Sequence, residues 1–190
     1  SLNSKKINEE NAKSLVCNIL SVDTTIRKTL ARQEELSRLA KKIKSDTSLF
    51  YIGRGLDYYL CLDGALKLKE ISYINSQDYP AGELKHGTIA LIEEGTVVVA
   101  LCTVNKLFDK ILSNIKEVKA RGAFVMAVAC EENTAVNDVS DYVINIPKTN
   151  PYFTNSLAII PLQLFAYYVA VGRGCDVDKP RNLAKSVTVE

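Results

Sequence analysis

The strongest constraint on the fold is a series of short, unbroken apolar runs separated by amphipathic segments. The runs cover residues 48–52, 96–101, 123–129 and 142–146 and read SLFYI, TVVVAL, AFVMAVA and YVINI. Strands without polar alternation are buried on both faces, and such strands joined by helices form parallel sheets. The sequence therefore predicts an α/β fold in which helices cover both faces of a parallel sheet.

Helical segments flank these runs. Residues 7–44 contain neither proline nor glycine and carry apolar residues mostly at three- and four-residue steps, which predicts helix. Asp23 and Thr24 offer a cap that would split this lead-in into at least two helices. The apolar stretch 156–171 is interrupted by a proline and a glutamine and is short for a membrane span, so we expect a buried helix.

The pattern divides the chain into three parts. We predict a helical lead-in at residues 1–45, a main domain at 46–173 and a polar tail at 174–190. The first residues, SLNSKK, have no apolar signal core, and the missing initiator methionine suggests a segment of a longer protein.

Charge and cysteine content narrow the possible partners. The formal charge is 24 − 22 = +2, which provides no strong field for nucleic acid or a membrane surface. The five cysteines are widely spread and never form a C-x-x-C pair, which argues against disulfides and a zinc site. We therefore expect a cytoplasmic protein with no metal, no cofactor, and no nucleic-acid or membrane partner.

A glycine turn follows the first apolar run. Gly53-Arg54-Gly55 lies between an expected strand and an expected helix, where unpaired backbone N–H groups and the helix dipole favour anions. The third glycine of the dinucleotide fingerprint is absent, as is a P-loop lysine. A plain strand-to-helix turn remains an alternative to an anion site.

Lys67 and Glu70 share one face of the helix after this turn, because residues three apart are surface neighbours. Such a pair is often an ordinary ion pair on a solvated stripe, which contributes only about 0.3–0.5 kcal/mol. Gly64 lies in the same helix, where glycine is unfavourable, and suggests close packing of the backbone. On a helix that is pressed against a sheet in this way, charged groups line a cleft more often than they face open water.

Two further residues could move protons. His86 is the only histidine and lies in a turn-prone context between Pro80 and Gly87, where a structural or incidental role is the alternative. Lys185 lies in a tail whose polar composition is typical of disorder, although its apolar neighbours could dock it. Burial lowers the pKa of a lysine from about 10.4 toward neutrality, as an amine nucleophile requires.

Four strings carry a resemblance to a known family: GALKLKEISYI, AGELKHG, PLQLFAYYVA and DVDKPRNLAKSVTVE. They resemble the isomerase part of the glutamine–fructose-6-phosphate aminotransferases, also called glucosamine-6-phosphate synthases, from about residue 48 to the last residue. In that family a glutaminase domain releases ammonia. Two tandem sugar isomerase (SIS) domains then convert fructose-6-phosphate plus ammonia to glucosamine-6-phosphate.

The resemblance implies that this chain is the second SIS domain with its C-terminal tail. It implies a flavodoxin-like, three-layer α/β/α fold with a mostly parallel five-stranded sheet. The hydroxyl-rich loop with which the family's first SIS domain holds the sugar phosphate has no counterpart here, because Gly53-Arg54-Gly55 stands in its place. We therefore expect the chain alone to be inactive.

The resemblance also implies a role for individual residues. Lys185 matches the lysine that forms a Schiff base with the open-chain ketose, and Glu70 matches the carboxylate that moves a proton between the first two sugar carbons. Lys67 matches the neighbour that stabilises the intermediate, and Ala184 matches a position whose backbone touches the sugar. His86 matches the ring-opening histidine, which in the family comes from the neighbouring subunit, so a homodimer that binds sugar phosphate is implied.

Two other functions compete with this interpretation. A non-catalytic SIS module that senses a phosphosugar would lack the set of Glu70, His86 and Lys185, and would often carry a helix-turn-helix, which the sequence does not suggest. A generic doubly wound nucleotide-binding domain is disfavoured by the incomplete glycine fingerprint.

Overall fold

The computed structural model describes residues 7–181, and its centre is a sheet of five parallel strands in the order β2-β1-β3-β4-β5. The strands are β1 Ser48–Gly53, β2 Asn75–Pro80, β3 Val97–Cys102, β4 Phe124–Cys130 and β5 Tyr142–Ile146. The order reverses beside β1, as in flavodoxin-like folds. The predicted parallel sheet is therefore confirmed.

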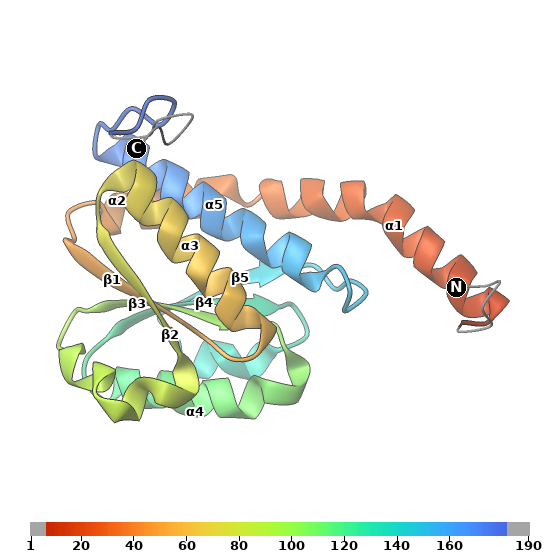
Figure 1. Ribbon diagram of the computed structural model, residues 1–190, viewed down its shortest axis with the longest axis horizontal. Helices are drawn as coiled ribbons and strands as arrows, with labels where there is room; N and C mark the ends of the chain where they lie inside the picture. Colours follow the sequence, from red (N-terminus) through yellow and green to blue (C-terminus); the bar gives the residue numbers. More distant parts are fainter. Residues whose placement is uncertain (1–6, 182–190) are drawn as a thin grey trace, which may run out of the picture.

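Helices cover both faces of this sheet. They are α1 Glu9–Leu30, α2 Gln33–Ile43, α3 Leu56–Ser72, α4 Phe108–Lys119 and α5 Thr154–Gly172, with short 3₁₀ segments η1 Ala81–His86, η2 Thr88–Leu91, η3 Asn105–Leu107 and η4 Thr134–Asp138. In Figure 1, α2, α3 and α5 lie on one side of the sheet and α4 on the other, while α1 extends away from the body. The predicted α/β/α layering is confirmed.

Each face of the sheet has its own apolar core. Consecutive strand residues point to opposite faces, so Tyr51 joins the core beneath α3 and α5, while Ile52 joins the core beneath α4. The residues of β1, β3 and β4 are almost all buried, which explains why these three strands lack polar alternation.

The sequence pattern did not locate β2. Its sequence, NSQDYP, is polar, and most of its side chains are only half-buried because it is an edge strand that pairs with β1 alone. An edge strand has less to bury than a central one, so the apolar-run criterion misses it.

The lead-in does not break at Asp23 and Thr24 as the sequence predicted. Asp23 pairs within the helix with Arg27, at 3.0 Å between Nε and Oδ2, so its carboxylate is not used as a cap. The break comes at Ala31–Arg32 instead, where the Arg32 guanidinium donates to the carbonyl of Asn145 at 2.9 Å. This contact ties the start of α2 to the end of β5.

The apolar helix α5 is a core helix, as predicted. By length and composition alone it could cross a membrane. It packs instead against α3 and α2, and Leu162, Phe165 and Val169 are fully buried in the core on that face of the sheet.

Gly64 lies where α3 touches both β1 and α5. A Cβ atom at this position would lie 3.0 Å from the Tyr51 ring and 3.0 Å from the Leu162 side chain, and both of these residues are completely buried. This explains a glycine inside a helix and confirms the predicted close packing.

Replacement of Gly64 by valine should therefore destabilise the fold. We expect Gly64→Val to lower the free energy of unfolding by about 1–3 kcal/mol, because the added atoms overpack the core. Lys69→Val, at an exposed position of the same helix, should change it by at most about 0.5 kcal/mol. Urea unfolding followed by circular dichroism measures both, and an equal loss in the two variants would contradict the packing argument.

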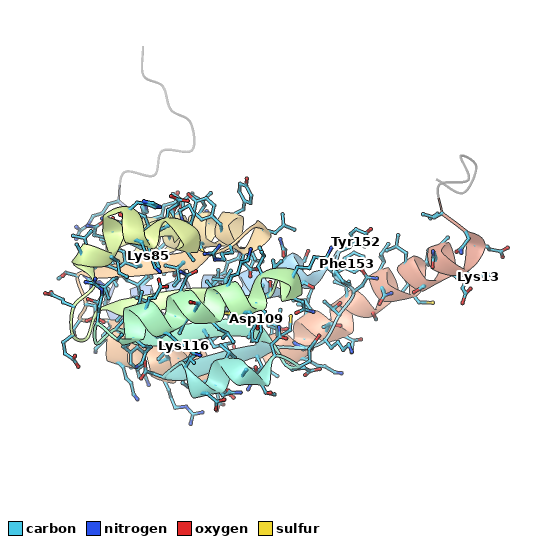
Figure 2. The ribbon with its side chains drawn as sticks, turned by 90° about the horizontal axis from the view of Figure 1, so that it is seen from below. Lys13, Lys85, Asp109, Lys116, Tyr152 and Phe153 are labelled. Carbon is cyan, nitrogen blue, oxygen red and sulfur yellow. The ribbon has the colours of Figure 1, made fainter. Side chains whose placement is uncertain are left out.

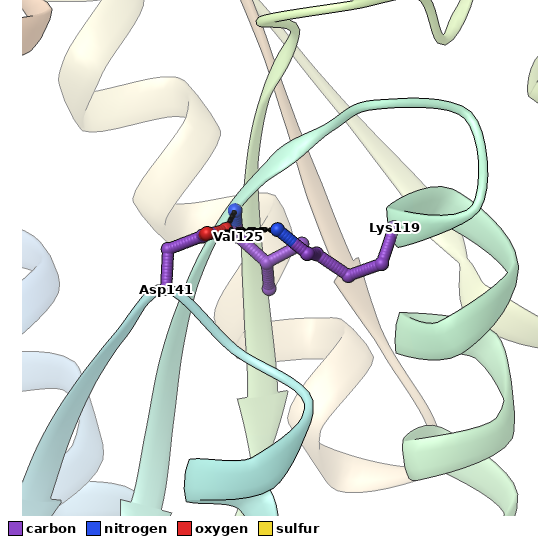
Figure 3. Close-up of polar contacts among 3 residues, drawn as sticks. All are labelled: Lys119, Val125 and Asp141. Atoms are coloured by element: carbon purple, nitrogen blue, oxygen red, sulfur yellow. Dashed lines mark hydrogen bonds and ion pairs between the residues drawn. The ribbon is translucent and has the colours of Figure 1, made fainter.

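Asp141 joins three elements at the amino edge of the sheet (Figure 3). Its Oδ2 accepts from the backbone N–H of Val125 at 2.7 Å, and both of its oxygens lie 2.7 Å from Lys119 Nζ. Burial alone would raise the pKa of Asp141, but the bonds from Lys119 and Val125 outweigh it and lower this pKa below its ordinary value. The charged form is therefore the one that stabilises the fold.

This lowered pKa predicts an acid-dependent loss of stability. The contribution of Asp141 should be complete above the unfolded-state pKa of about 3.9, and it should disappear as pH falls through the lower folded-state pKa. Asp141→Asn should therefore lose less stability than the wild type between about pH 6 and about pH 3. The matched control Asp138→Asn, at an exposed carboxylate without an ion pair among the described residues, should keep the wild-type slope. Urea unfolding at both pH values tests this.

Candidate active site

The pair Lys67 and Glu70 lies on the flank of α3. Lys67 Nζ is 3.1 Å from Glu70 Oε2, and the two side chains are 42% and 32% exposed. The buried stripe of the helix runs through Cys61, Gly64 and Leu68, so the pair stands beside the packed face and remains open to solvent. A second molecule or segment can therefore reach the pair.

An apolar surface adjoins this pair on the same helix. Tyr59, Leu62 and Leu66 are exposed and follow one another at three- and four-residue steps, so they form one stripe. The carboxylate and ammonium thus lie next to apolar surface, where an added layer of protein would exclude water and strengthen their electrostatic interactions.

Arg181, the last residue that the structure describes, contacts the C-terminal end of α3. Its backbone N–H donates to the Tyr73 hydroxyl at 2.8 Å, and its guanidinium lies 4.5 Å from the centre of the Tyr73 ring. Tyr73 is the C-cap of α3 and has a positive φ of 63°, so it stands one turn beyond Glu70. Arg181 is therefore fixed at the C-terminal end of α3, the helix that carries Lys67 and Glu70. Lys185 and Ala184 themselves lie outside the described residues.

His86 lies at the other end of the sheet. It ends η1, directly after β2, its side chain is 75% exposed, and its Nε2 is 3.7 Å from Glu83 Oε2. Lys67 and Glu70 lie near the end of α3 that leads into the amino end of β2, and six strand residues span about 20 Å. The structure therefore does not bring His86 to the pair within one chain.

The glycine turn helps to fix the segment that carries His86. Arg54 Nε donates to Asn114 Oδ1 at 2.9 Å, and its guanidinium lies against Gly82, where a Cβ would be 3.2 Å from Nη1 and Nη2. Leu84 is fully buried beneath the same segment. The Gly53-Arg54-Gly55 turn thus helps to hold η1 in place through the Arg54 side chain. The sequence did not suggest this role.

The first turn of α3 carries a buried carboxylate, Asp57, which binds the segment after β3. Asp57 is 2% exposed, and its Oδ2 accepts from the backbone N–H groups of Thr103 at 2.8 Å and Val104 at 3.2 Å. The Thr103 hydroxyl donates to its other oxygen. Burial raises the pKa of Asp57, while these bonds oppose the shift. Asp57 thus joins the start of α3 to the end of β3, a role that the sequence analysis did not predict.

The family model described as "SIS domain" matches residues 42–173. Among curated relatives, a glutamine–fructose-6-phosphate aminotransferase of Caldanaerobacter subterraneus is 54% identical over 93% of this chain and 29% of its own length. The enzyme of that name from Methanosarcina acetivorans is 46% identical over 97% of this chain and 30% of its own length. The chain thus spans under a third of the relatives it matches.

A solved structure agrees with this match. The C-terminal domain of glucosamine-fructose-6-phosphate aminotransferase from Francisella tularensis is 33% identical, with a TM-score of 0.83 over 92% of this chain and 49% of that one. The chain therefore belongs to the SIS domain family, as a match to the C-terminal SIS domain of the glutamine–fructose-6-phosphate aminotransferases.

Proposed function

We propose that the chain supplies the second isomerase half of an enzyme that makes glucosamine-6-phosphate from fructose-6-phosphate and glutamine-derived ammonia. The names of the relatives support this, since they match nearly the whole chain at 46–54% identity. Because the chain spans about 30% of their length, we expect the chain alone to be inactive. The sugar phosphate and a cytoplasmic location belong to the same proposal.

The contact between Arg181 and Tyr73 is the observation that carries this proposal. Lys185 is four residues beyond Arg181, and an extended chain spans about 3.5 Å per residue, so it can reach about 14 Å from this anchor. Glu70 lies three residues before Tyr73, a helical rise of about 4.5 Å. An amine at Lys185 is thus within reach of the Lys67–Glu70 pair, which supports residues 174–190 as an active-site tail.

These residues fit the chemistry of a ketose that becomes an amino aldose. The Lys185 amine would attack the C2 carbonyl of the open-chain sugar and expel water to give an imine, and ammonia would displace the lysine from C2. Glu70 would then take a proton from C1 and return it to C2, while the proton of the C1 hydroxyl passes to the C2 nitrogen, which leaves the amine on C2 and the aldehyde on C1. Lys67 would stabilise the negative charge that develops between these steps.

We further propose that a second copy of the chain provides His86. Within one chain His86 lies at the opposite end of the sheet from the pair, yet its imidazole is largely exposed and available to a neighbour. A homodimer in which His86 faces the partner's α3 would supply the proton transfer for ring opening.

The proposal predicts a strong effect at Glu70. In a protein of the relatives' full length that contains this chain, Glu70→Gln should lower kcat for glucosamine-6-phosphate formation by about 10²–10⁴, because the amide cannot accept the C1 proton. Lys69→Met, at an exposed neighbouring position of α3, serves as the matched control and should leave kcat unchanged. Product assay by chromatography measures both, and normal synthesis by Glu70→Gln would reject the proposed role.

The tail makes a separate prediction. Lys185→Arg in the same full-length protein should abolish synthesis, since a guanidinium stays protonated and cannot form the imine. Glutamine hydrolysis should remain measurable, because it takes place in another domain of the proposed enzyme. Synthesis at the wild-type rate by this variant would refute the Schiff-base role.

A further inference from the structure

Asn114 is a polar residue of α4 that is only 5% exposed, and both ends of its side-chain amide are used. Its Oδ1 accepts from Arg54 Nε at 2.9 Å, and its Nδ2 donates to Glu117 Oε2 at 3.3 Å. A guanidinium can only donate and a carboxylate can only accept, so an amide is suited to join the two. Asn114 therefore holds a cation and an anion in fixed places on either side of it.

Arg54 and Glu117 each contact η1, the segment that ends at His86. The Arg54 guanidinium lies against Gly82, where a Cβ atom would be 3.2 Å from both Nη1 and Nη2. Glu117 Oε1 lies 2.9 Å from Lys85 Nζ, and Figure 2 shows Lys85 where η1 lies beside α4. Both contacts of η1 therefore depend on the amide that joins Arg54 and Glu117.

These contacts act on one face of η1. Residues three apart in a 3₁₀-helix lie on the same face, which divides η1 into three faces. One face is fully buried, one meets Arg54 and Glu117, and one is open to solvent. These faces are, in that order, Ala81 with Leu84, Gly82 with Lys85, and Glu83 with His86. The first two faces together fix the rotation of η1 about its axis, and with it the direction of the His86 imidazole.

η1 is poorly suited to hold this orientation by itself. The hydrogen bonds of a 3₁₀-helix have poor geometry, and runs longer than three or four residues are uncommon. η1 has six residues and is followed by Gly87, whose φ of 140° favours glycine. Within residues 7–181 the His86 imidazole pairs with Glu83 alone, and Glu83 belongs to the same segment. The direction of the imidazole is therefore set by contacts from outside η1.

We propose that Asn114 is a positioning residue for ring opening, because it holds through Arg54 and Glu117 the segment that presents His86 to the second copy. This inference rests on the proposed function, in which His86 serves that step. Opening the furanose ring breaks the bond between C2 and O5, while O5 gains a proton and the C2 hydroxyl loses one. A misplacement of about 1 Å can lower the rate of such a step about 10²-fold.

Two substrates separate ring opening from the later steps in the full-length protein. Fructose-6-phosphate must open its ring, whereas 5-deoxyfructose 6-phosphate has no hydroxyl on C5 and stays open. Asn114→Leu keeps the size of the side chain but forms neither hydrogen bond. We expect it to lower kcat/KM for fructose-6-phosphate about 10–100-fold and to change the value for the open analogue less than about twofold. A general loss of folded enzyme would lower both values alike.

Three further variants make the result specific. His86→Asn should show the same selective loss, since it removes the group that Asn114 is proposed to position. Glu117→Met, at a partly exposed position, removes the acceptor for Asn114 and the ion pair with Lys85, and its loss should also be selective. Lys116→Met, at the exposed neighbouring position of α4, is the matched control and should leave both values unchanged.

NMR of the ¹⁵N-labelled 190-residue chain tests the geometry without catalysis. Asn114→Leu should shift or broaden the amides of residues 81–87, and Lys116→Met should not. Unchanged amides there, an equal loss with both substrates, or a selective loss in His86→Asn but not in Asn114→Leu would overturn the inference and leave the proposed function in place. Absence of a selective loss in His86→Asn would instead reject the ring-opening role of His86, and the inference with it.

Discussion

The hydrogen bonds from Thr103 and Val104 to the buried carboxylate of Asp57 fix the first turn of α3 to the end of β3. Gly64 fixes the middle of the helix by close contact with Tyr51 and Leu162, and Tyr73 holds the chain at its end through Arg181. A rigid α3 gives Lys67 and Glu70 a defined place, as proton transfer requires. The proposed chemistry therefore depends first on how this one helix is held.

The two ends of the sheet carry different groups. At the amino end of β2 lie the Lys67–Glu70 pair and the anchor of the tail, and at the carboxyl edge lies His86. Since one chain keeps His86 and the pair apart, a site that uses both requires two copies. The exposed apolar stripe of α3 beside the pair is consistent with burial against another surface.

The sequence predicted the parts of the fold that follow from burial. The four apolar runs form the strands β1, β3, β4 and β5, and the glycine in α3 marks close packing, because each of these features has a local cause. It missed β2, a polar edge strand, and misplaced the break in the lead-in, because the contact of Arg32 with Asn145 joins residues far apart in the chain. Spacing correctly predicted that Lys67 and Glu70 pair on one face of a helix, and their catalytic roles belong to the proposal. The roles of Asp57 and Arg54 depend on tertiary contacts and needed the structure.

The most direct test of the account is subunit complementation. Glu70→Gln and His86→Asn variants of the full-length protein, each inactive alone, would be co-expressed or unfolded together and reassembled. Random pairing makes half of the dimers mixed. If the pair and His86 come from different subunits, each mixed dimer contains one intact site out of two. We therefore expect synthesis to return to about a quarter of the wild-type rate. No recovery, with mixed dimers demonstrated by mass spectrometry, would contradict a site shared between two copies of this chain.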